Sequence, residues 1–268
     1  MITVSFQGEL GAYSEEAARS FFGDEIKPVP QPSFAEALEL TASSKTDRTI
    51  LPVENSIEGS VGESYALLYS TSLKVIGETY HHIKHFLIGT GSLEDVDTVY
   101  SHPQALGQCR NFLQAHHIKA IPAYDTAGSV GIIQKIDRPN VACIASQHAS
   151  ATYGIPTIQG DIADDSNNTT RFLILARHSC EACAPHKTSI VFSLRHEPGS
   201  LQRVLQKFYE CGTNLTKIES RPKKDTRWEY NFFVDFEGST TQDILEEIRD
   251  CTTFLRVLGT YPAATTRT

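Results

Sequence analysis

The chain has 268 residues, of which 40% are hydrophobic and 21% are charged, an ordinary composition for a water-soluble globular protein. Its formal net charge of −8 argues against nucleic acid as a general partner, because phosphate binding needs a basic surface. No apolar run approaches the length of a membrane span. Residues 1–6 start directly into a strand pattern without a signal segment, so we expect a cytoplasmic protein.

The first third of the chain alternates predicted strands and helices. The predicted elements are strands at 3–6 and 49–53, a short strand ending at Val29, and helices capped by Ser14 and by Ser33. After the 49–53 strand, the polar loop 54–62 leads into a helix over 63–69. Backbone amides at a helix N-terminus favour anions, so we expect an anion-binding loop here. An ordinary strand-to-helix turn explains the same pattern equally well.

From Thr98 onward the pattern repeats strand and helix three times, which is typical of parallel strands covered by helices. Further on, the polar stretch 167–171 leads into the apolar run 172–176, which predicts a strand covered on both faces. The leading end of such a strand opens on the crevice where α/β sheets bind ligands. The alternative for the polar stretch is a turn that caps a core strand. We expect two subdomains, about 1–79 with 167–178, and 80–166.

Residues 187–268 predict a second unit of order βαββαβ, a ferredoxin-like split motif. The predicted strands are 188–194, 215–220, 228–236 and 254–260, with helices over 200–211 and 241–251. The polar segment 179–186 is interpreted as a linker between this unit and a domain over 1–178. The basic turn 221–227 is interpreted as solvated surface, because the aromatic interleaving of an RNA-binding sheet is absent.

Six cysteines in a cytoplasmic chain indicate free thiols rather than disulfides. Cys180 and Cys183 stand between His178 and His186, a spacing compatible with zinc ligands. A polar linker without metal or redox role is the favoured interpretation, and the alternative stays open. The chain's other histidine cluster consists of His81, His82 and His85. It has no carboxylate at metal spacing, so we predict no metal there.

Six short strings stand out in order along the chain. They are Phe6-Gln7-Gly8-Glu9 with Gly11-Ala12-Tyr13-Ser14, Pro52 to Val61, Ser101 to Leu106, Asp125 to Ser129, Asn167 to Phe172, and Glu219-Ser220-Arg221-Pro222. Together they resemble the signature segments of prephenate dehydratases over nearly the whole chain. The sequence departs from the family pattern at Leu10, where proline is usual, which bears on the rigidity of that loop. The resemblance implies a two-lobed α/β catalytic domain, similar to type-II periplasmic binding proteins, with a cleft between the lobes and no metal or cofactor.

The resemblance also implies site residues. Thr170 matches the family's essential threonine, and we expect it to hydrogen-bond the leaving hydroxyl while Asn55 and Gln104 hold substrate oxygens. Arg171 is expected to pair with a substrate carboxylate, with a salt bridge that supports the cleft as the equal alternative. Phe172 is placed at the site by the motif, although core packing is its favoured role. The other expected substrate-binding residues are Glu54, Ser56, Ser101 and Thr126.

The C-terminal unit resembles an ACT domain, the small regulatory module that binds amino acids, here with Ser200 where alanine is frequent. We expect it to bind L-phenylalanine and to pair with another copy, giving a homodimer or homotetramer. The expected effector-binding residues are His196, Pro198, Gly199, Ser200, Leu201, Asn214, Leu215, Thr216, Glu219, Ser220, Arg221 and Pro222.

The resemblance therefore implies decarboxylating dehydration of prephenate to phenylpyruvate in L-phenylalanine biosynthesis, with feedback inhibition by L-phenylalanine. Arogenate dehydration is a near alternative, because no residue decides between the two substrates. A non-catalytic amino-acid sensor is the alternative of another class. A fused chorismate mutase is not expected, because the dehydratase pattern begins at Thr3.

Overall fold

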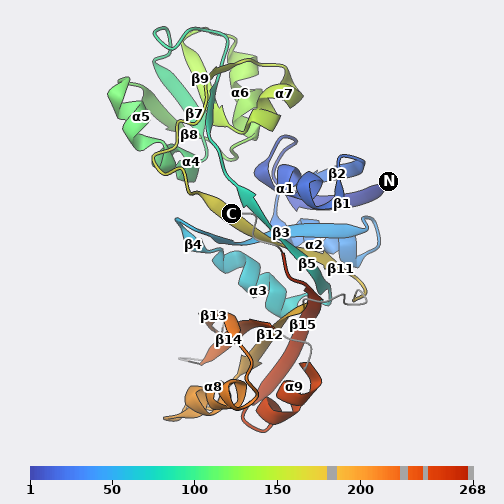
Figure 1. Cartoon of the computed structure of the whole chain (residues 1–268). Helices are drawn as coiled ribbons and strands as arrows, with labels where there is room; N and C mark the ends of the chain where they lie inside the picture. The colour runs from blue at the N-terminus through green and yellow to red at the C-terminus, as the bar shows by residue number, and fades with distance from the viewer. Residues whose placement is uncertain (180–185, 224–228, 238–240, 265–268) are drawn as a thin grey trace. The chain divides into compact units, whose positions relative to one another are not determined.

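The computed structural model describes residues 1–179, 186–223, 229–237 and 241–264, and Figure 1 traces the whole chain. The chain divides into two compact units, one of residues 1–60 with 79–172 and the other of residues 61–78 with 173–268. In the described part, no helix is long and apolar enough to cross a membrane, and no group of three or more His, Cys, Asp or Glu residues is arranged to hold a metal. Cys180 and Cys183 lie outside the described residues.

One sheet carries the N-terminal strands and has the order β2-β1-β3-β11-β5, with β4 paired to β3. Its strands are β1 (Ile2–Gln7), β2 (Ile26–Gln31), β3 (Arg48–Asn55), β4 (Gly59–Ser60), β5 (Lys74–His82) and β11 (Thr169–Ala176). β1 runs parallel to both β2 and β3. The sheet contributes to a solvent-excluded hydrophobic core, as the apolar runs predicted. Its residues Val4, Phe6, Ile50 and Leu51 have no solvent exposure.

Two helices follow strands of this sheet, α1 (Tyr13–Phe22) and α2 (Phe34–Ala42). The Ser33 hydroxyl accepts a bond from the Glu36 backbone N–H at 3.2 Å, which confirms the predicted cap of α2. The predicted cap of α1 is wrong, because the helix begins at Tyr13 and Ser14 lies inside its first turn. The Glu15 carboxylate instead accepts a bond from the Gly11 N–H at 2.9 Å.

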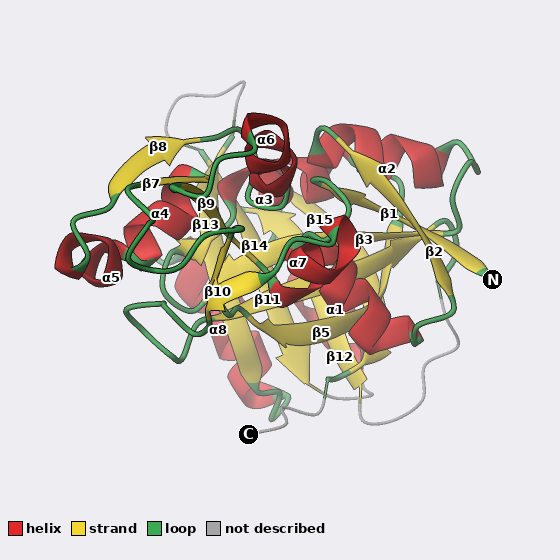
Figure 2. Ribbon diagram, turned by 90° about the horizontal axis from the view of Figure 1, so that it is seen from above, coloured by secondary structure: helices red, strands yellow, loops and turns green. Residues whose placement is uncertain are grey.

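A second sheet in the first unit has the order β10-β6-β9-β7-β8; Figure 2 labels its strands β7, β8, β9 and β10. Its elements are β6 (Phe86–Ile88), β7 (Thr98–Ser101), α4 (Pro103–Gln108), α5 (Arg110–Ala115), β8 (Lys119–Pro122), α6 (Gly128–Ile136), β9 (Val141–Ala145), α7 (Gln147–Tyr153) and β10 (Thr157–Gln159). β7 is parallel to β8 and β9, which confirms the predicted alternation, whereas β6 is antiparallel to β9 and β10.

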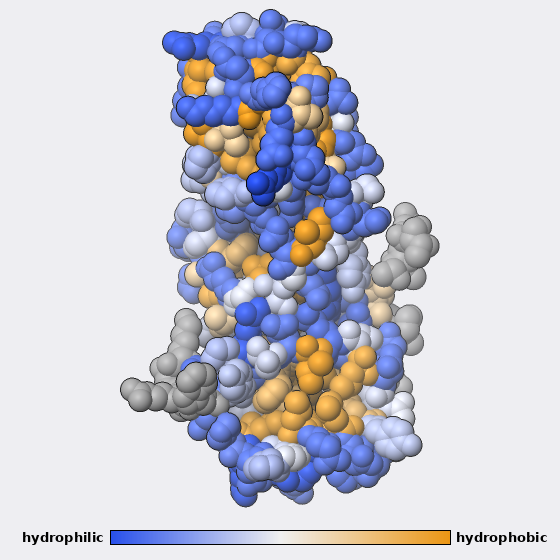
Figure 3. All heavy atoms as spheres, turned by 90° about the vertical axis from the view of Figure 1, so that its left-hand side faces the viewer, coloured by the Kyte–Doolittle hydropathy of each residue, from blue (hydrophilic) through white to orange (hydrophobic). Residues whose placement is uncertain are grey.

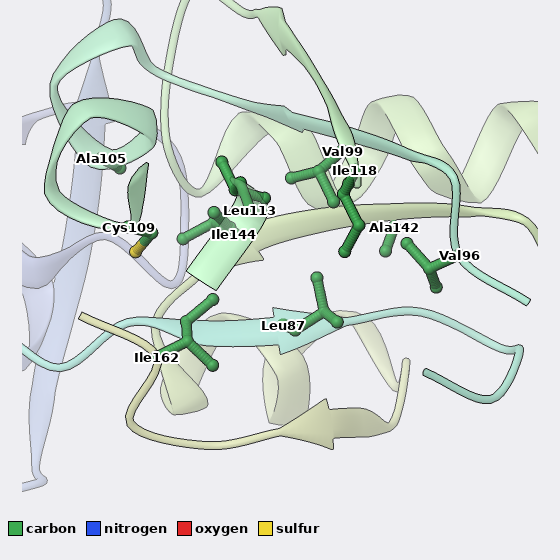
Figure 4. Close-up of a cluster of buried hydrophobic side chains, with 10 residues drawn as sticks. All are labelled: Leu87, Val96, Val99, Ala105, Cys109, Leu113, Ile118, Ala142, Ile144 and Ile162. Carbon is green, nitrogen blue, oxygen red and sulfur yellow. The ribbon is translucent and has the colours of Figure 1, made fainter. Parts of the chain in front are cut away.

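Separate apolar clusters cover the two faces of this second sheet. Leu87, Val99 and Ile144 belong to one cluster, which also holds Leu113 of α5 (Figure 4). Side chains alternate along a strand, so their neighbours Ile88 and Cys143 join the other cluster, with α6 and α7. Coverage on both faces is the arrangement expected of a mainly parallel sheet.

The C-terminal part of the second unit has the predicted order βαββαβ, in an antiparallel sheet β13-β14-β12-β15. Its elements are β12 (His186–Ser193), α8 (Ser200–Glu210), β13 (Leu215–Pro222), β14 (Tyr230–Glu237), α9 (Thr241–Arg249) and β15 (Phe254–Pro262). Val234 and Phe236 of β14 pack in one cluster with residues of α8 and α9. The fold class predicted from the sequence, a two-lobed α/β domain followed by a ferredoxin-like unit, is confirmed.

Helix α3 (Gly62–Ser70) belongs to the second unit although it follows the first strands in sequence. Phe233 alternates with the core residues of β14 and meets the Tyr65 ring edge-on, with ring centroids 4.9 Å apart. Arg256 of β15 donates to the carbonyl oxygens of Leu68 and Thr71 at the C-terminal end of α3. The helix therefore covers the face of the C-terminal sheet opposite α8 and α9.

Hydrophilic residues cover most of the face shown in Figure 3, and apolar residues gather between them at several places. Such a mixture is normal, since about half of a folded protein's accessible surface is apolar. Among the large hydrophobic side chains of the described residues, Met1 is the most exposed, followed by Tyr209 and Tyr124.

Gly11 allows the α1 segment to approach helix α7 closely. Its φ is +88°, and a Cβ at this position would lie 2.6 Å from the Ala149 Cα. We expect Gly11→Ala to lower the free energy of unfolding by about 1–3 kcal/mol, through backbone strain and overpacking together, as measured by urea denaturation. Gly23→Ala is the matched control, because Gly23 has φ +87° and its Cβ would meet nothing within 4 Å. Equal losses in the two variants would show that the Ala149 contact contributes nothing.

Candidate active site

Two residues predicted to be catalytic lie on neighbouring strands of the N-terminal sheet and touch. Asn55 ends β3, Thr170 is near the start of β11, and the Asn55 Nδ2 donates to the Thr170 Oγ1 at 2.9 Å. Asn55 Nδ2 also donates to the Asn168 Oδ1 at 2.6 Å. Asn55 and Thr170 are 6% and 9% exposed, so the hydroxyl lies at the margin of a buried polar cluster.

Backbone groups fix the orientation of the Asn55 amide. Asn55 Oδ1 accepts bonds from the backbone N–H groups of Ile57 and Glu58, both at 3.0 Å. Because backbone N–H groups can only donate, the oxygen must face them and the NH₂ group must face Thr170. Thr170 Oγ1 therefore accepts in this bond, and its own proton is left to donate to a ligand. This polarity is what a hydroxyl that assists a leaving group requires.

The polar cluster continues from the N-terminal sheet to the second sheet's helices. Asn168 Nδ2 donates to Gln108 Oε1 at 2.9 Å, and His85 Nε2 lies 2.8 Å from the same oxygen. His85 Nδ1 in turn lies 2.8 Å from the Tyr13 hydroxyl. Gln108 ends α4, whereas Tyr13 begins α1, so the network joins elements from both lobes of the first unit.

The sequence predicted a role for Gln104, whereas the structure places Gln108 in the polar network with Asn168 and His85. Gln104 is exposed, and its side chain is outside the network formed by the described residues; its backbone N–H meets the His102 ring at 3.3 Å. Gln108 lies one helical turn further along α4. Gln104 and Gln108 are four residues apart on the same helix. The sequence alone therefore does not show which of the two side chains reaches the network; the position of the helix decides it. Asn168 belongs to the segment 167–172 that carries the family resemblance, two residues before Thr170, but no role was expected of it.

Other predicted substrate-binding residues hold the local structure. Ser56 Oγ donates to the Asn167 carbonyl at 2.9 Å and accepts from the Thr169 N–H at 3.0 Å, which joins the 54–60 loop to β11. Ser101 Oγ is buried and donates to the Ile144 carbonyl at 2.7 Å. The Thr126 carbonyl accepts a bond from Ser129 Oγ. The Ser56 and Ser101 hydroxyls therefore have partners within the protein, whereas the Thr126 bond uses only its backbone carbonyl.

Strand alternation separates Arg171 from Thr170. Neighbouring residues on a strand point to opposite faces, so Arg171 lies on the other face of β11, where it is 5% exposed. This burial favours the alternative role, support of the fold, over a contact with substrate. Phe172 is 2% exposed and packs in the core, which was its favoured role. Glu54 is half-buried at the end of β3, next to Asn55.

Burial shifts several pKa values in the first unit. Burial lowers the pKa of His85, so its imidazole is neutral at pH 7. Burial, helped by the charge of Glu9, raises the pKa of Asp125, which accepts a bond from the Gly128 N–H at 2.7 Å. Burial also raises the pKa of Glu15, but hydrogen bonds from His148, Gly11 and Arg19 outweigh it and leave that pKa at about 2.

The residues predicted to bind an effector fall in two places of the C-terminal sheet. His196, Ser200 and Leu201 line a hollow of about 140 Å³ at the start of α8, with Gly199 as its left-handed N-cap at φ +82°. Arg221 and Pro222, at the end of β13, instead line a cavity of about 570 Å³ beside α3. The other predicted positions on β13 or next to it are Asn214, Leu215, Thr216, Glu219 and Ser220, and the remaining one, Pro198, precedes Gly199.

A family model described as prephenate dehydratase matches residues 4–180, and one described as ACT domain matches residues 188–252. A relative named arogenate dehydratase/prephenate dehydratase 2, chloroplastic, from Arabidopsis thaliana is 40% identical over 99% of this chain and 74% of its own length.

Two solved structures share the whole architecture. The prephenate dehydratase of Arthrobacter aurescens in complex with L-Phe is 29% identical, with a TM-score of 0.88 over 97% of this chain and 90% of that one. A protein described as GqqA, a novel type of quorum quenching acylase, is 27% identical, with a TM-score of 0.91 over 99% of this chain and 100% of that one.

Proposed function

Because this chain belongs to the prephenate dehydratase family and carries an ACT domain, we propose that it converts prephenate to phenylpyruvate and is inhibited by L-phenylalanine. The observation that carries the proposal is the Asn55–Thr170 contact, which leaves the threonine proton free to donate. We propose residues 1–178 as the catalytic domain and 187–268 as the regulatory domain, in a cytoplasmic homo-oligomer.

The protein has little covalent chemistry to perform in this reaction. The bond between the ring and its carboxylate breaks, its electron pair enters the ring, and the hydroxyl on the opposite ring carbon leaves and is protonated to water. Carbon dioxide, water and an aromatic ring result, so no external electron acceptor is needed. Thr170 donates a hydrogen bond to the leaving oxygen and relays to it a proton that solvent replaces, and such assistance contributes about 10²–10⁴-fold.

Substrate binding has to be local, because the net charge of −8 opposes a dianion. Uncharged hydrogen-bond donors can supply this local binding of the substrate without adding charge to the site. The Gln108 Nε2 points toward the 54–60 loop, where it lies 3.4 Å from the Glu58 carboxylate. We propose that Gln108, rather than Gln104, holds a substrate oxygen beside Thr170. In this proposal, three further predicted residues lie along the route by which the substrate enters and contact it less closely than Gln108 does. They are Gln104, Glu54 and Thr126.

The regulatory proposal rests on the shape of the α8 hollow. At about 140 Å³ it is smaller than typical ligand pockets of about 300–1,000 Å³. We propose that a second copy of the chain completes it, so that L-phenylalanine binds between paired ACT domains. The structure of the Arthrobacter aurescens protein with L-Phe supports this ligand.

Helix α3 supplies a route from the regulatory sheet to the catalytic loop. Tyr65 of α3 meets Phe233, and the Arg221 guanidinium carbon lies 5.5 Å from the centroid of the Tyr65 ring. The helix begins at Gly62, directly after the loop that holds Asn55. An effector that moves β13 or β14 therefore moves α3, and through it the loop that orients Asn55. A ligand shifts such an equilibrium only by its differential affinity for the two arrangements.

Phenylpyruvate formation from prephenate tests this proposal, with arogenate assayed in parallel and L-phenylalanine added to each. We expect turnover of prephenate that L-phenylalanine suppresses. Arogenate differs only in an amino group in place of the side-chain ketone, and the name of the Arabidopsis relative carries both activities. Preferred turnover of arogenate would replace the substrate in the proposal. Absence of turnover with either substrate, from folded protein, would favour an amino-acid sensor.

A further inference from the structure

His85 is buried in the polar cluster behind Thr170, and both of its ring nitrogens are engaged. It lies between β5 and β6 and is 2% exposed. Nε2 lies 2.8 Å from Gln108 Oε1, and Nδ1 lies 2.8 Å from the Tyr13 hydroxyl, which is also 2.7 Å from the Lys84 carbonyl. The proposed mechanism assigns no role to this histidine. Its imidazole is nevertheless buried with a partner for each ring nitrogen, which requires neighbouring side chains at specific positions.

The direction of every bond in the cluster follows from the backbone. The N–H groups of residues 57 and 58 hold the Asn55 oxygen, so the Asn55 NH₂ group faces Asn168 and meets its oxygen. The Asn168 NH₂ group then faces Gln108, which must present Oε1 to accept the bond. An oxygen in that position can only accept from His85, so the ring proton sits on Nε2.

The rest of the histidine ring is consistent with this tautomer. Burial lowers the pKa of His85, so the ring is neutral and carries one proton. Nδ1 is then an acceptor for the Tyr13 hydroxyl proton, which the Lys84 carbonyl shares. His85 Nε2 and the Asn168 NH₂ group both donate to the Gln108 side-chain oxygen. Rotating the Gln108 amide by 180° would place its NH₂ group against both of these donors.

We propose that His85, held by Tyr13, is a positioning residue that locks the Gln108 side-chain amide with its N–H groups toward the substrate. The inference rests on the proposed function, because the benefit arises with an anionic substrate. With the lock, Gln108 offers N–H donors to a substrate oxygen. Without His85, Asn168 alone opposes rotation of the Gln108 amide, so the inverted orientation is populated more, presents a carbonyl oxygen to an anion and weakens its binding.

His85→Phe and His85→Gln form the test pair. Phenylalanine keeps a planar ring and removes the donor, whereas glutamine places an N–H close to the former Nε2. We expect His85→Phe to lower kcat/KM for prephenate by about 10–100-fold, mostly through KM, and His85→Gln to recover most of the loss. His82→Phe, at an exposed histidine three residues away, should leave kcat/KM unchanged. Equal losses in His85→Phe and His85→Gln would overturn the lock.

A double-variant cycle separates positioning from a merely structural role. In Gln108→Leu there is no amide to orient, so adding His85→Phe should cause no further loss of kcat/KM. Multiplying losses would overturn the proposal, because they would show that His85 acts independently of Gln108. Urea denaturation of each variant confirms that the compared proteins are folded.

The tautomer gives a readout that does not depend on turnover. We expect ¹⁵N NMR of the imidazole to show His85 neutral, with its proton on Nε2, at pH 7. A proton on Nδ1 would overturn the lock even if the enzyme turns over prephenate. Wild-type inactivity with both prephenate and arogenate, together with the Nε2–H tautomer, would instead remove the proposed function and leave the geometry of the lock standing.

Discussion

Thr170→Ala is expected to lower kcat for prephenate by about 10²–10⁴-fold, the range of a lost general acid. The Thr170 hydroxyl accepts from Asn55 and, in the proposed mechanism, donates toward the leaving oxygen, and alanine removes both functions. Stability should change little, by no more than about 1 kcal/mol, because the side chain borders the site and water can replace the acceptor that Asn55 loses. Steady-state kinetics and thermal unfolding on the same preparations measure both effects.

Serine and valine replacements distinguish the hydroxyl from the shape of threonine. Thr170→Ser keeps a hydroxyl within reach of Asn55 Nδ2 and should retain more activity than Thr170→Val, which keeps the shape but cannot donate. The reverse order would assign Thr170 a packing role. Near-normal turnover of Thr170→Ala would remove it from the mechanism altogether.

The elements of this chain could be predicted well where periodicity and capping agree. The Ser33 cap of α2 was predicted and is observed, and the order βαββαβ was predicted from alternating apolar runs. The cap of α1 was not, because the helix already begins at Tyr13, which places Ser14 inside its first turn, and its N-cap Ala12 has no side-chain cap bond.

The site was predicted less completely because its contacts join distant parts of the sequence. Asn55 and Thr170 came from short strings, and the structure brings them together. Gln108 and His85 could not be selected, since a network that runs through 85, 108 and 168 has no sequence signature. The association of α3 with the C-terminal sheet was equally hidden, because the Tyr65–Phe233 contact is not encoded by either segment alone.

A buried ion pair provides the largest expected effect on stability. Lys187 of β12 donates to the Glu78 carboxylate at 2.7 Å, and their side chains are 8% and 0% exposed. The Ala264 N–H donates to the same carboxylate at 3.1 Å. The pair connects β5 to the first strand of the C-terminal sheet, and both residues belong to the second unit.

Lys187→Met is expected to lower the free energy of unfolding by about 3–5 kcal/mol, because it removes the Lys187 charge that pairs with the buried Glu78 carboxylate. Urea denaturation measures the loss. Lys207→Met is the control, since Lys207 forms exposed ion pairs with Glu210 and Glu247 and such pairs contribute little; we expect nearly unchanged stability. The double variant Glu78→Gln/Lys187→Met removes the buried charge while keeping an acceptor for the Ala264 N–H, so it should recover most of the loss. If Lys187→Met cost as much in the Glu78→Gln background as in the wild type, the stabilisation would come from packing of the lysine stem and not from the ion pair.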